Sequence, residues 1–188
     1  MHLYPWIVTD QDRIHWDDRH GRLGAAPVGA AGPPEVFAPY QDAFPTRGRA
    51  LDLACGRGSG AVWLASRGLE VWGLDVSTVA VDRARDLARQ SGVVDRCTFD
   101  VVDLDDGLPP GPPVDVILCH LFRDSRLDAA IVGRLAPGGL LAMAVLSEVD
   151  VGPGPFRATA GELRAAFADL AVMAEGEQNG RAWLLATA

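Results

Sequence analysis

The sequence contains no lysine and has few cysteines and histidines, and each shortage excludes a class of protein. All 17 basic residues are arginine, set against 25 acidic residues, which gives a formal net charge of −8. This balance disfavours a phosphate-binding surface and predicts that the chain has no nucleic-acid partner. Cys55, Cys97 and Cys119 lie in apolar segments and indicate free thiols in a reducing compartment. The four scattered histidines show no metal-ligand spacing.

Long apolar runs are also missing. No stretch approaches the roughly 20 apolar residues that a membrane span needs. The first 13 residues carry acids and no continuous apolar segment, which is unlike a secretory signal. We therefore expect a cytoplasmic protein with no membrane partner. The 48% of hydrophobic residues and 22% of charged residues in a chain of 188 are typical of one globular domain.

The chain divides into an irregular start and a regular remainder, which we expect to form a single domain over residues 1–188. Residues 1–48 predict short N-terminal helices that form a lid, and residues 49–188 predict a cofactor-binding core. In that core, apolar strands alternate with helices, and such alternation favours a mostly parallel sheet covered on both faces. The last two strands have the spacing of an antiparallel hairpin. Strands are expected at 50–54, 69–74, 97–102, 114–119, 140–145, 170–174 and 181–187, and helices at 61–67, 77–90, 127–135 and 160–167.

A glycine-rich turn follows the first expected strand, in Leu51-Asp-Leu-Ala-Cys-Gly-Arg-Gly-Ser-Gly60. In open α/β sheets, ligands bind outside the carboxyl ends of the strands, where glycine allows the backbone to approach them closely. Gly56, Gly58 and Ala61 also satisfy the pattern G-x-G-x-x-A of a dinucleotide site, so a nicotinamide-dependent oxidoreductase stays open at this point.

Acidic residues accompany three successive strands at the same edge. Asp52 lies inside the first strand, Asp75 ends the second, and Asp103 follows the third. An anion at Asp52 repels a pyrophosphate and attracts a cationic group, while Asp75 is placed to accept hydrogen bonds from a ribose diol. Asp103 with Leu104 offers an acceptor for an exocyclic amine beside an apolar contact. The three acids together favour a nucleoside with an amino-acid tail and no phosphate.

These segments resemble the class I S-adenosylmethionine-dependent methyltransferases. The stretch from Asp52 to Gly60 is similar to their first motif, and 73–77 (Gly-Leu-Asp-Val-Ser) to their second. Asp103-Leu104 resembles the adenine-contacting step, 114–119 the fourth-strand motif, and 135–139 the turn before the fifth strand. The resemblance implies a doubly wound, Rossmann-like, seven-stranded mixed sheet of order 3-2-1-4-5-7-6, with S-adenosylmethionine as cofactor.

The resemblance also implies a role for each matching position. The methionine part would be bound by Asp52, Ala54, Gly56 and Gly58, the ribose by Asp75 and Val76, the adenine by Asp103 and Leu104, and the methyl group would be bordered by Cys119, His120 and Leu121. Many members have glycine at the position of Ala54. The alanine requires only that the ligand lie slightly farther from the backbone.

Methyl transfer from a sulfonium is an in-line displacement that needs alignment and exclusion of water more than acid–base chemistry. His120 is the candidate general base; the alternative is that it caps a helix or bonds to a carbonyl group. Arg123 and Arg126 are candidates for binding an anionic acceptor, with helix-start ion pairs to Asp124 and Asp128 as the alternative. Asp103, Asp105 and Asp106 lack further ligands, so no metal is expected. Candidate lid residues that close over cofactor and substrate, or that simply pack on the sheet edge, are Trp16, Asp17, Arg19 and His20.

The sequence thus predicts methyl transfer from S-adenosylmethionine to a small-molecule acceptor. The small size of the chain gives it a narrower likeness to the tellurite-resistance and thiopurine-type members of the family. Two alternatives stay open: an NAD(P)-dependent oxidoreductase, which gives Asp52 and Asp103 no obvious role, and a non-catalytic S-adenosylmethionine-binding module, which would lack an organised acceptor pocket.

Overall fold

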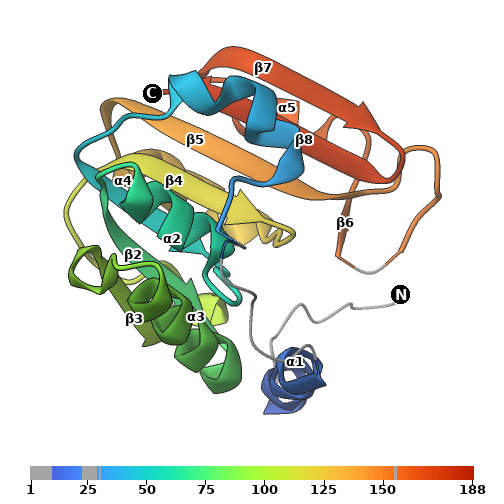
Figure 1. The fold of residues 1–188 in the computed structure, drawn as a ribbon. Helices are drawn as coiled ribbons and strands as arrows, with labels where there is room; N and C mark the ends of the chain where they lie inside the picture. The colour runs from blue at the N-terminus through green and yellow to red at the C-terminus, as the bar shows by residue number, and fades with distance from the viewer. Residues whose placement is uncertain (1–9, 23–28, 30, 155) are drawn as a thin grey trace.

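One mixed sheet forms the centre of the protein (Figure 1). The computed structural model describes residues 10–22, 29, 31–154 and 156–188. The strands follow the spatial order β3-β2-β1-β4-β5-β8-β7, with β6 paired to β5 outside this path. The strand bounds are β1 Arg49–Leu53, β2 Glu70–Asp75, β3 Cys97–Val101, β4 Val114–His120, β5 Leu135–Ser147, β6 Arg157–Ala158, β7 Ala171–Gln178 and β8 Arg181–Thr187.

The order confirms the expected sheet, with β8 and β7 as its antiparallel closing pair. Two details differ from the sequence prediction. The two-residue β6 adds an eighth strand, and it is too short to leave a periodic signal. β5 begins at Leu135 instead of Leu140, because Leu135 already pairs with Val114 across a register shift in β4. The segment Pro137-Gly138-Gly139 therefore lies within a bulged strand and does not form a separate turn.

Helices cover both faces of the sheet. The helix bounds are α1 Asp10–Arg22, η1 Glu35–Ala43, α2 Ser59–Ser66, α3 Thr78–Gln90, η2 Val94–Arg96, η3 Leu104–Asp106, η4 Ser125–Leu127, α4 Asp128–Arg134 and α5 Glu162–Ala166. Side chains of η1, α2 and α3 pack on one face, and those of α4 and α5 on the other. α1 lies apart from the sheet and contacts α3 (Figure 1). None of the helices in these described ranges has the length and apolar character that crossing a bilayer requires.

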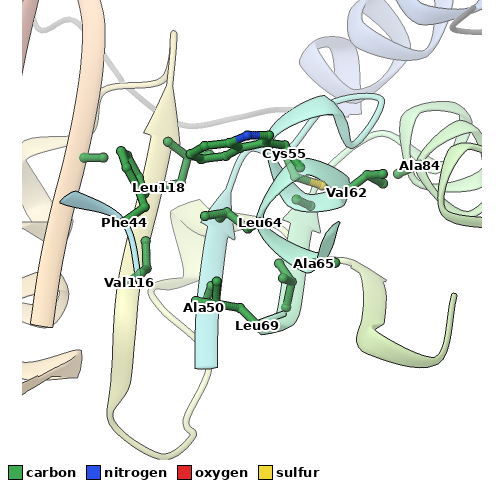
Figure 2. Packing of buried hydrophobic residues seen from close by; sticks show 14 of the residues in the cluster. Phe44, Ala50, Cys55, Val62, Leu64, Ala65, Leu69, Ala84, Val116 and Leu118 are labelled. Carbon is green, nitrogen blue, oxygen red and sulfur yellow. The ribbon is translucent and has the colours of Figure 1, made fainter. Parts of the chain in front are cut away.

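The central strands are apolar on both sides, and their alternation sorts the core into two clusters. In β4, Val116 and Leu118 face the α2 side, whereas Ile117 and Cys119 face the α4 side. Figure 2 shows the first cluster, in which Val116 and Leu118 lie near residues of α2. Since parallel strands buried on both faces need an apolar residue at nearly every position, this explains the continuous apolar run of β4.

Two local features fix the turns at the carboxyl ends of the strands. Ser77 is the N-cap of α3, as predicted, and its hydroxyl accepts a hydrogen bond from the Ala80 N–H at 3.1 Å. Ala54, which follows β1, has φ +50°, a left-handed conformation that costs a residue with a Cβ about 1 kcal/mol. The departure from glycine at Ala54 is therefore a matter of backbone strain as well as of ligand approach.

A buried ion-pair network joins the loop after β4 to α4 and α5. The Arg123 guanidinium bonds to Asp128 at 2.5 and 2.9 Å and donates from Nε to Glu162 at 2.7 Å. Its side chain is only 6% exposed. Burial opposes its positive charge, but the two carboxylates outweigh burial and raise the pKa of Arg123 above its usual value. The network therefore fixes α4 relative to α5.

Removing Arg123 should destabilise the fold strongly, because it leaves two carboxylates without their buried partner. We expect Arg123→Ala to lower the free energy of unfolding by about 3 kcal/mol. The matched control is Arg164→Ala, which breaks a 3.7 Å pair with Glu175 between half-exposed side chains and should cost under about 1 kcal/mol. Urea denaturation of both variants checks this, and equal losses would contradict a structural role for the buried network.

Candidate functional site

Asp75 lies at the end of β2 and links two turns. Its Oδ2 accepts a hydrogen bond from the Gly56 N–H at 2.7 Å, in the glycine turn after β1. Its Oδ1 accepts one from the Ser77 N–H at 2.9 Å, at the start of α3. Each carboxylate oxygen keeps a second lone pair for an external donor. The side chain therefore offers two acceptor positions at the predicted ribose site.

The pKa of Asp75 is raised above its ordinary value, chiefly by burial. The two backbone hydrogen bonds and the nearby His20 oppose this rise. A further hydrogen-bond donor would stabilise the Asp75 anion by replacing its lost hydration, and the hydroxyls of a ribose are donors of that kind.

Asp52 lies deeper in the site than Asp75. It pairs with Gly73 in the sheet, two positions before Asp75 along β2, and is only 3% exposed. Burial raises the pKa of Asp52 to about 8, although a hydrogen bond from the Ala61 backbone lowers it. The sequence suggests a fixed anion here, but without a cation nearby the buried carboxyl is mostly protonated at pH 7.

The residues expected at the adenine lie after β3. Asp103 caps the short helix η3, and its Oδ1 accepts a hydrogen bond from the Asp105 N–H at 2.9 Å. Leu104 beside it is 5% exposed and belongs to the core cluster on the α4 side. Val76, expected at the ribose, is half-buried between Asp75 and Ser77.

The two glycines of the turn have different surroundings. A Cβ on Gly58 would lie 2.7 Å from the Cβ of Ala84, so this glycine allows α2 to approach α3. A Cβ on Gly56 would meet only His20, at 3.6 Å from Cε1. Gly56 is therefore the glycine of the pair that faces α1, whereas Gly58 is required by packing and by its φ of +80°.

Helix α1 is attached to the start of α3 by Asp17. The Asp17 carboxylate accepts hydrogen bonds from the Ser77 hydroxyl at 2.5 Å and from the Val79 N–H at 3.2 Å. A carboxylate at a helix N-terminus is favoured by the exposed N–H groups and the helix dipole. The contact places α1 beside the glycine turn.

The other candidate lid residues of α1 form a stack that ends at the site. The Arg19 guanidinium lies 5.4 Å from the Trp16 ring, and the Trp16 and His20 rings are 6.0 Å apart. Burial lowers the pKa of His20, against the effect of Asp75. The His20 Nδ1 is buried without a hydrogen-bond partner in the part of the chain that the structure describes. The residues 1–9, the start of the expected lid, lie outside the described residues.

The end of β4 carries Cys119 and His120. Cys119 is buried, and its thiol donates to the Phe122 carbonyl group at 3.3 Å; burial raises its pKa to about 12. The His120 side chain is accessible at the end of β4. Its pKa is lowered by partial loss of hydration and by the positive charge of Arg181. Leu121 follows with φ +63° and is 43% exposed. The chain therefore turns sharply just after the candidate base.

Arg123 lies apart from the accessible surface of the site. Its donors are directed at Asp128 and Glu162, which matches the ion-pair alternative and leaves them turned away from an acceptor. Arg181 lies near His120 instead. Sequence reasoning missed Arg181, and the signal that could have found it is the antiparallel direction of β8, which brings the first residue of that strand to the ligand edge.

The residues at this edge fit S-adenosylmethionine. Among the described residues, Asp75 has unused acceptor positions and the His20 Nδ1 lacks a partner, and Gly56 has no side chain that would fill the space. A nucleoside with hydroxyl and amino groups can satisfy each of these polar atoms. No group of three or more His, Cys, Asp or Glu residues suited to a metal ion occurs among the described residues.

Comparisons with known proteins agree with this geometry. Residues 50–139 match the family model described as a methyltransferase domain. The chain is 36% identical over 120 residues to ribosomal protein L11 methyltransferase of Syntrophotalea carbinolica, covering 62% of this chain and 38% of that protein. It is 33% identical over 105 residues to tRNA 5-carboxymethoxyuridine methyltransferase of Escherichia coli, covering 53% and 40%. The chain thus spans well under two thirds of the length of these curated relatives.

A solved structure extends the likeness to nearly the whole chain. Geranyl diphosphate C-methyltransferase from Streptomyces coelicolor A3(2) superposes with a TM-score of 0.71 at 16% identity, covering 98% of both chains. This similarity shows the fold. The matched domain, the sheet order and the strand-end acids favour the methyltransferase interpretation over a nicotinamide-dependent one. The chain therefore carries a class I S-adenosylmethionine-dependent methyltransferase domain.

Proposed function

We propose that the protein transfers the methyl group of S-adenosylmethionine to a small-molecule acceptor by in-line displacement. The observation that carries the proposal is the placement of Asp75, held by Gly56 and Ser77 with free acceptor positions beside the glycine turn. The likeness to tellurite-resistance and thiopurine-type members stays a prediction.

The chain would hold the cofactor through the three strand-end acids. Asp75 would bind the ribose hydroxyls, Asp103 with Leu104 would bind the adenine, and Asp52 would face the charged methionine end. When bound, the cofactor supplies a methyl group on a positively charged sulfur. Helix α1, attached through Asp17, would limit the access of water to this edge.

His120 would serve acceptors that must lose a proton. Its lowered pKa keeps the imidazole neutral at pH 7, and the neutral ring can accept the proton of a hydroxyl or amine acceptor as that atom is methylated. A thiolate acceptor needs no base. Trp16, Arg19 and His20 lie on α1, beside the glycine turn, and from there they would contact the cofactor or the acceptor.

A small acceptor is favoured by the charge of the chain, since a net charge of −8 disfavours a phosphate-rich partner. The relatives named above act on a ribosomal protein and on a tRNA, so the class of acceptor needs a direct assay. The panel should contain thiols, phenols, amines and tellurite, together with a tRNA and a ribosomal-protein fraction.

Cofactor choice can be tested by calorimetry with S-adenosylhomocysteine and NADH. We expect S-adenosylhomocysteine to bind and NADH not to bind. Asp75→Ala should weaken S-adenosylhomocysteine binding by about 1–3 kcal/mol, the cost of lost hydrogen bonds in a buried site. Asp95→Asn, on the exposed helix η2, is the control and should leave affinity unchanged. Unchanged affinity in Asp75→Ala would contradict the ribose role, and cofactor binding without turnover of any acceptor would indicate a binding module.

Asp52 predicts a pH dependence of stability. Its pKa is about 8 in the folded protein, whereas the ordinary value for an unburied aspartate is 3.8. Between these values the folded protein holds a proton that the unfolded chain has released, so Asp52 makes the free energy of unfolding fall as pH rises from about 4 to 8. Asp52→Asn stays neutral, so it should be more stable than the parent at pH 8, with the difference shrinking toward pH 4.

Urea denaturation at pH 5, 6.5 and 8 checks this expectation, again with Asp95→Asn as the control. Asp52→Asn should also bind S-adenosylhomocysteine more weakly at pH 8, because a neutral amide cannot pair with the ammonium group of the ligand. A parallel pH profile for the variant and the parent would contradict the buried, protonated state of Asp52.

A further inference from the structure

A cavity of about 120 Å³ lies beside His120. It is in the half of the sheet formed by β4, β5 and β8, away from β2 and β3 in the strand order. It opens between the start of η1, the ends of β4 and β5, and the start of β8. Its walls are Glu35, Val36, His120, Ala144, Val145, Arg181 and Ala182. The cavity is thus apolar at its base, where Ala144, Val145 and Ala182 are buried, and charged around its rim.

Arg181 is brought to this rim by the topology of the sheet. β8 runs antiparallel to β5, and Arg181 pairs with Leu146 near the end of β5. Arg181 lies on the same face as Trp183, two residues later, and the Trp183 ring packs against Phe37 of η1 at 6.2 Å. The Arg181 side chain is therefore on the η1 side of the sheet, where His120 also lies.

The charge of Arg181 is not neutralised within the described part of the protein. The side chains of Arg181 and Glu35 are both exposed at the rim, and neither side chain makes a hydrogen bond or ion pair with a described residue, although both line the same cavity. Other arginines near the carboxyl edge, such as Arg123 and Arg126, are paired with aspartates. In a chain with a net charge of −8, an arginine left unpaired at a cavity is a candidate ligand for an external anion.

The backbone next to the cavity is strained. Leu121, directly after His120, has φ +63°, and its N–H bonds to the Ala144 carbonyl group at 2.7 Å. A non-glycine residue in this region costs free energy and persists where surrounding contacts hold it, which is frequent at ligand sites. Here the hydrogen bond to Ala144 holds β4 and β5 together at the cavity wall.

We propose that this cavity is the acceptor subsite and that it binds an acceptor carrying a carboxylate, which pairs with Arg181. The inference rests on the proposed methyl transfer, because His120 is then the neighbour of both the acceptor and the transferred methyl. The carboxylate lies at the Arg181 side of the rim, away from Glu35, which repels it. Glu35 favours a hydrogen-bond donor on the other end of the same acceptor.

Three probes of one shape and different charge test this assignment: benzoate, benzamide and benzylamine. Binding to the full chain saturated with S-adenosylhomocysteine is measured by calorimetry, and contact with His120 by the NMR shifts of its imidazole. Benzoate should bind roughly tenfold tighter than benzamide, as expected for a charge-assisted pair, and should shift the His120 signals. Benzylamine should bind no tighter than benzamide.

Variants assign the preference to its residue. Arg181→Gln should reduce benzoate affinity to that of benzamide, Arg181→Lys should retain part of the preference, and Glu35→Gln should strengthen benzoate binding. Arg164→Gln, on the opposite face in α5, removes the same charge and should change nothing. Circular dichroism confirms that each variant is folded.

The possible failures are distinguishable. If S-adenosylhomocysteine does not bind, the proposed function itself fails. If S-adenosylhomocysteine binds, the methyltransferase assignment stands and the carboxylate subsite can fail in three ways. Either benzoate binds no tighter than benzamide, or it leaves the His120 signals unshifted, or Arg181→Gln still binds benzoate more tightly than benzamide. Each of these results overturns the carboxylate subsite. A preference for benzylamine would overturn it as well and would assign the rim to Glu35.

Discussion

The Asp75 carboxylate holds the ligand edge of this protein together. One oxygen accepts the Gly56 N–H and the other the Ser77 N–H, so a single side chain fixes the turn after β1 against the turn after β2. Ser77 in turn caps α3 and donates to Asp17 of α1. The Asp75 carboxylate and its partner Ser77 therefore position the glycine turn, the start of α3 and the N-terminal helix relative to one another.

Burial at this edge has a cost that a ligand can offset. Burial raises the pKa of both Asp52 and Asp75, and a neighbouring carboxylate adds to each rise: Asp75 for Asp52, and Asp17 for Asp75. A cation or a set of hydroxyl donors at the edge compensates them. The stability of the free protein is thus lowered by the same groups that would give it affinity for a positively charged nucleoside, a trade that is common at functional sites.

Prediction from the sequence succeeded where the signal is local. The Ser77 cap depends on residues three apart, and the helix that it begins ends at Gln90 as expected. The strand order followed from the motifs of a known family, with β6 as the missed strand. The start of β5 was misplaced because the pairing of Leu135 with Val114 across a register shift outweighs the turn propensity of Pro137-Gly138-Gly139.

The candidate site was less accessible to such reasoning, because its contacts join distant residues. Arg123 bonds to Glu162, 39 positions away, and no pattern around either residue indicates it. Asp17 reaches Ser77 across 60 positions, and the approach of His20 to Gly56 depends on that contact. The placement of the strand-end acids could be foreseen, but the raised pKa of Asp52 could not, since it depends on burial.

The reversed direction of β8 separates the two halves of the site along the chain. The residues that we propose to face the nucleoside all come from the first 104 positions, whereas the cavity rim near His120 receives its positive charge from Arg181. Exchanging the C-terminal hairpin between homologous enzymes would therefore transplant the proposed determinant of acceptor preference while the proposed nucleoside site keeps its own residues.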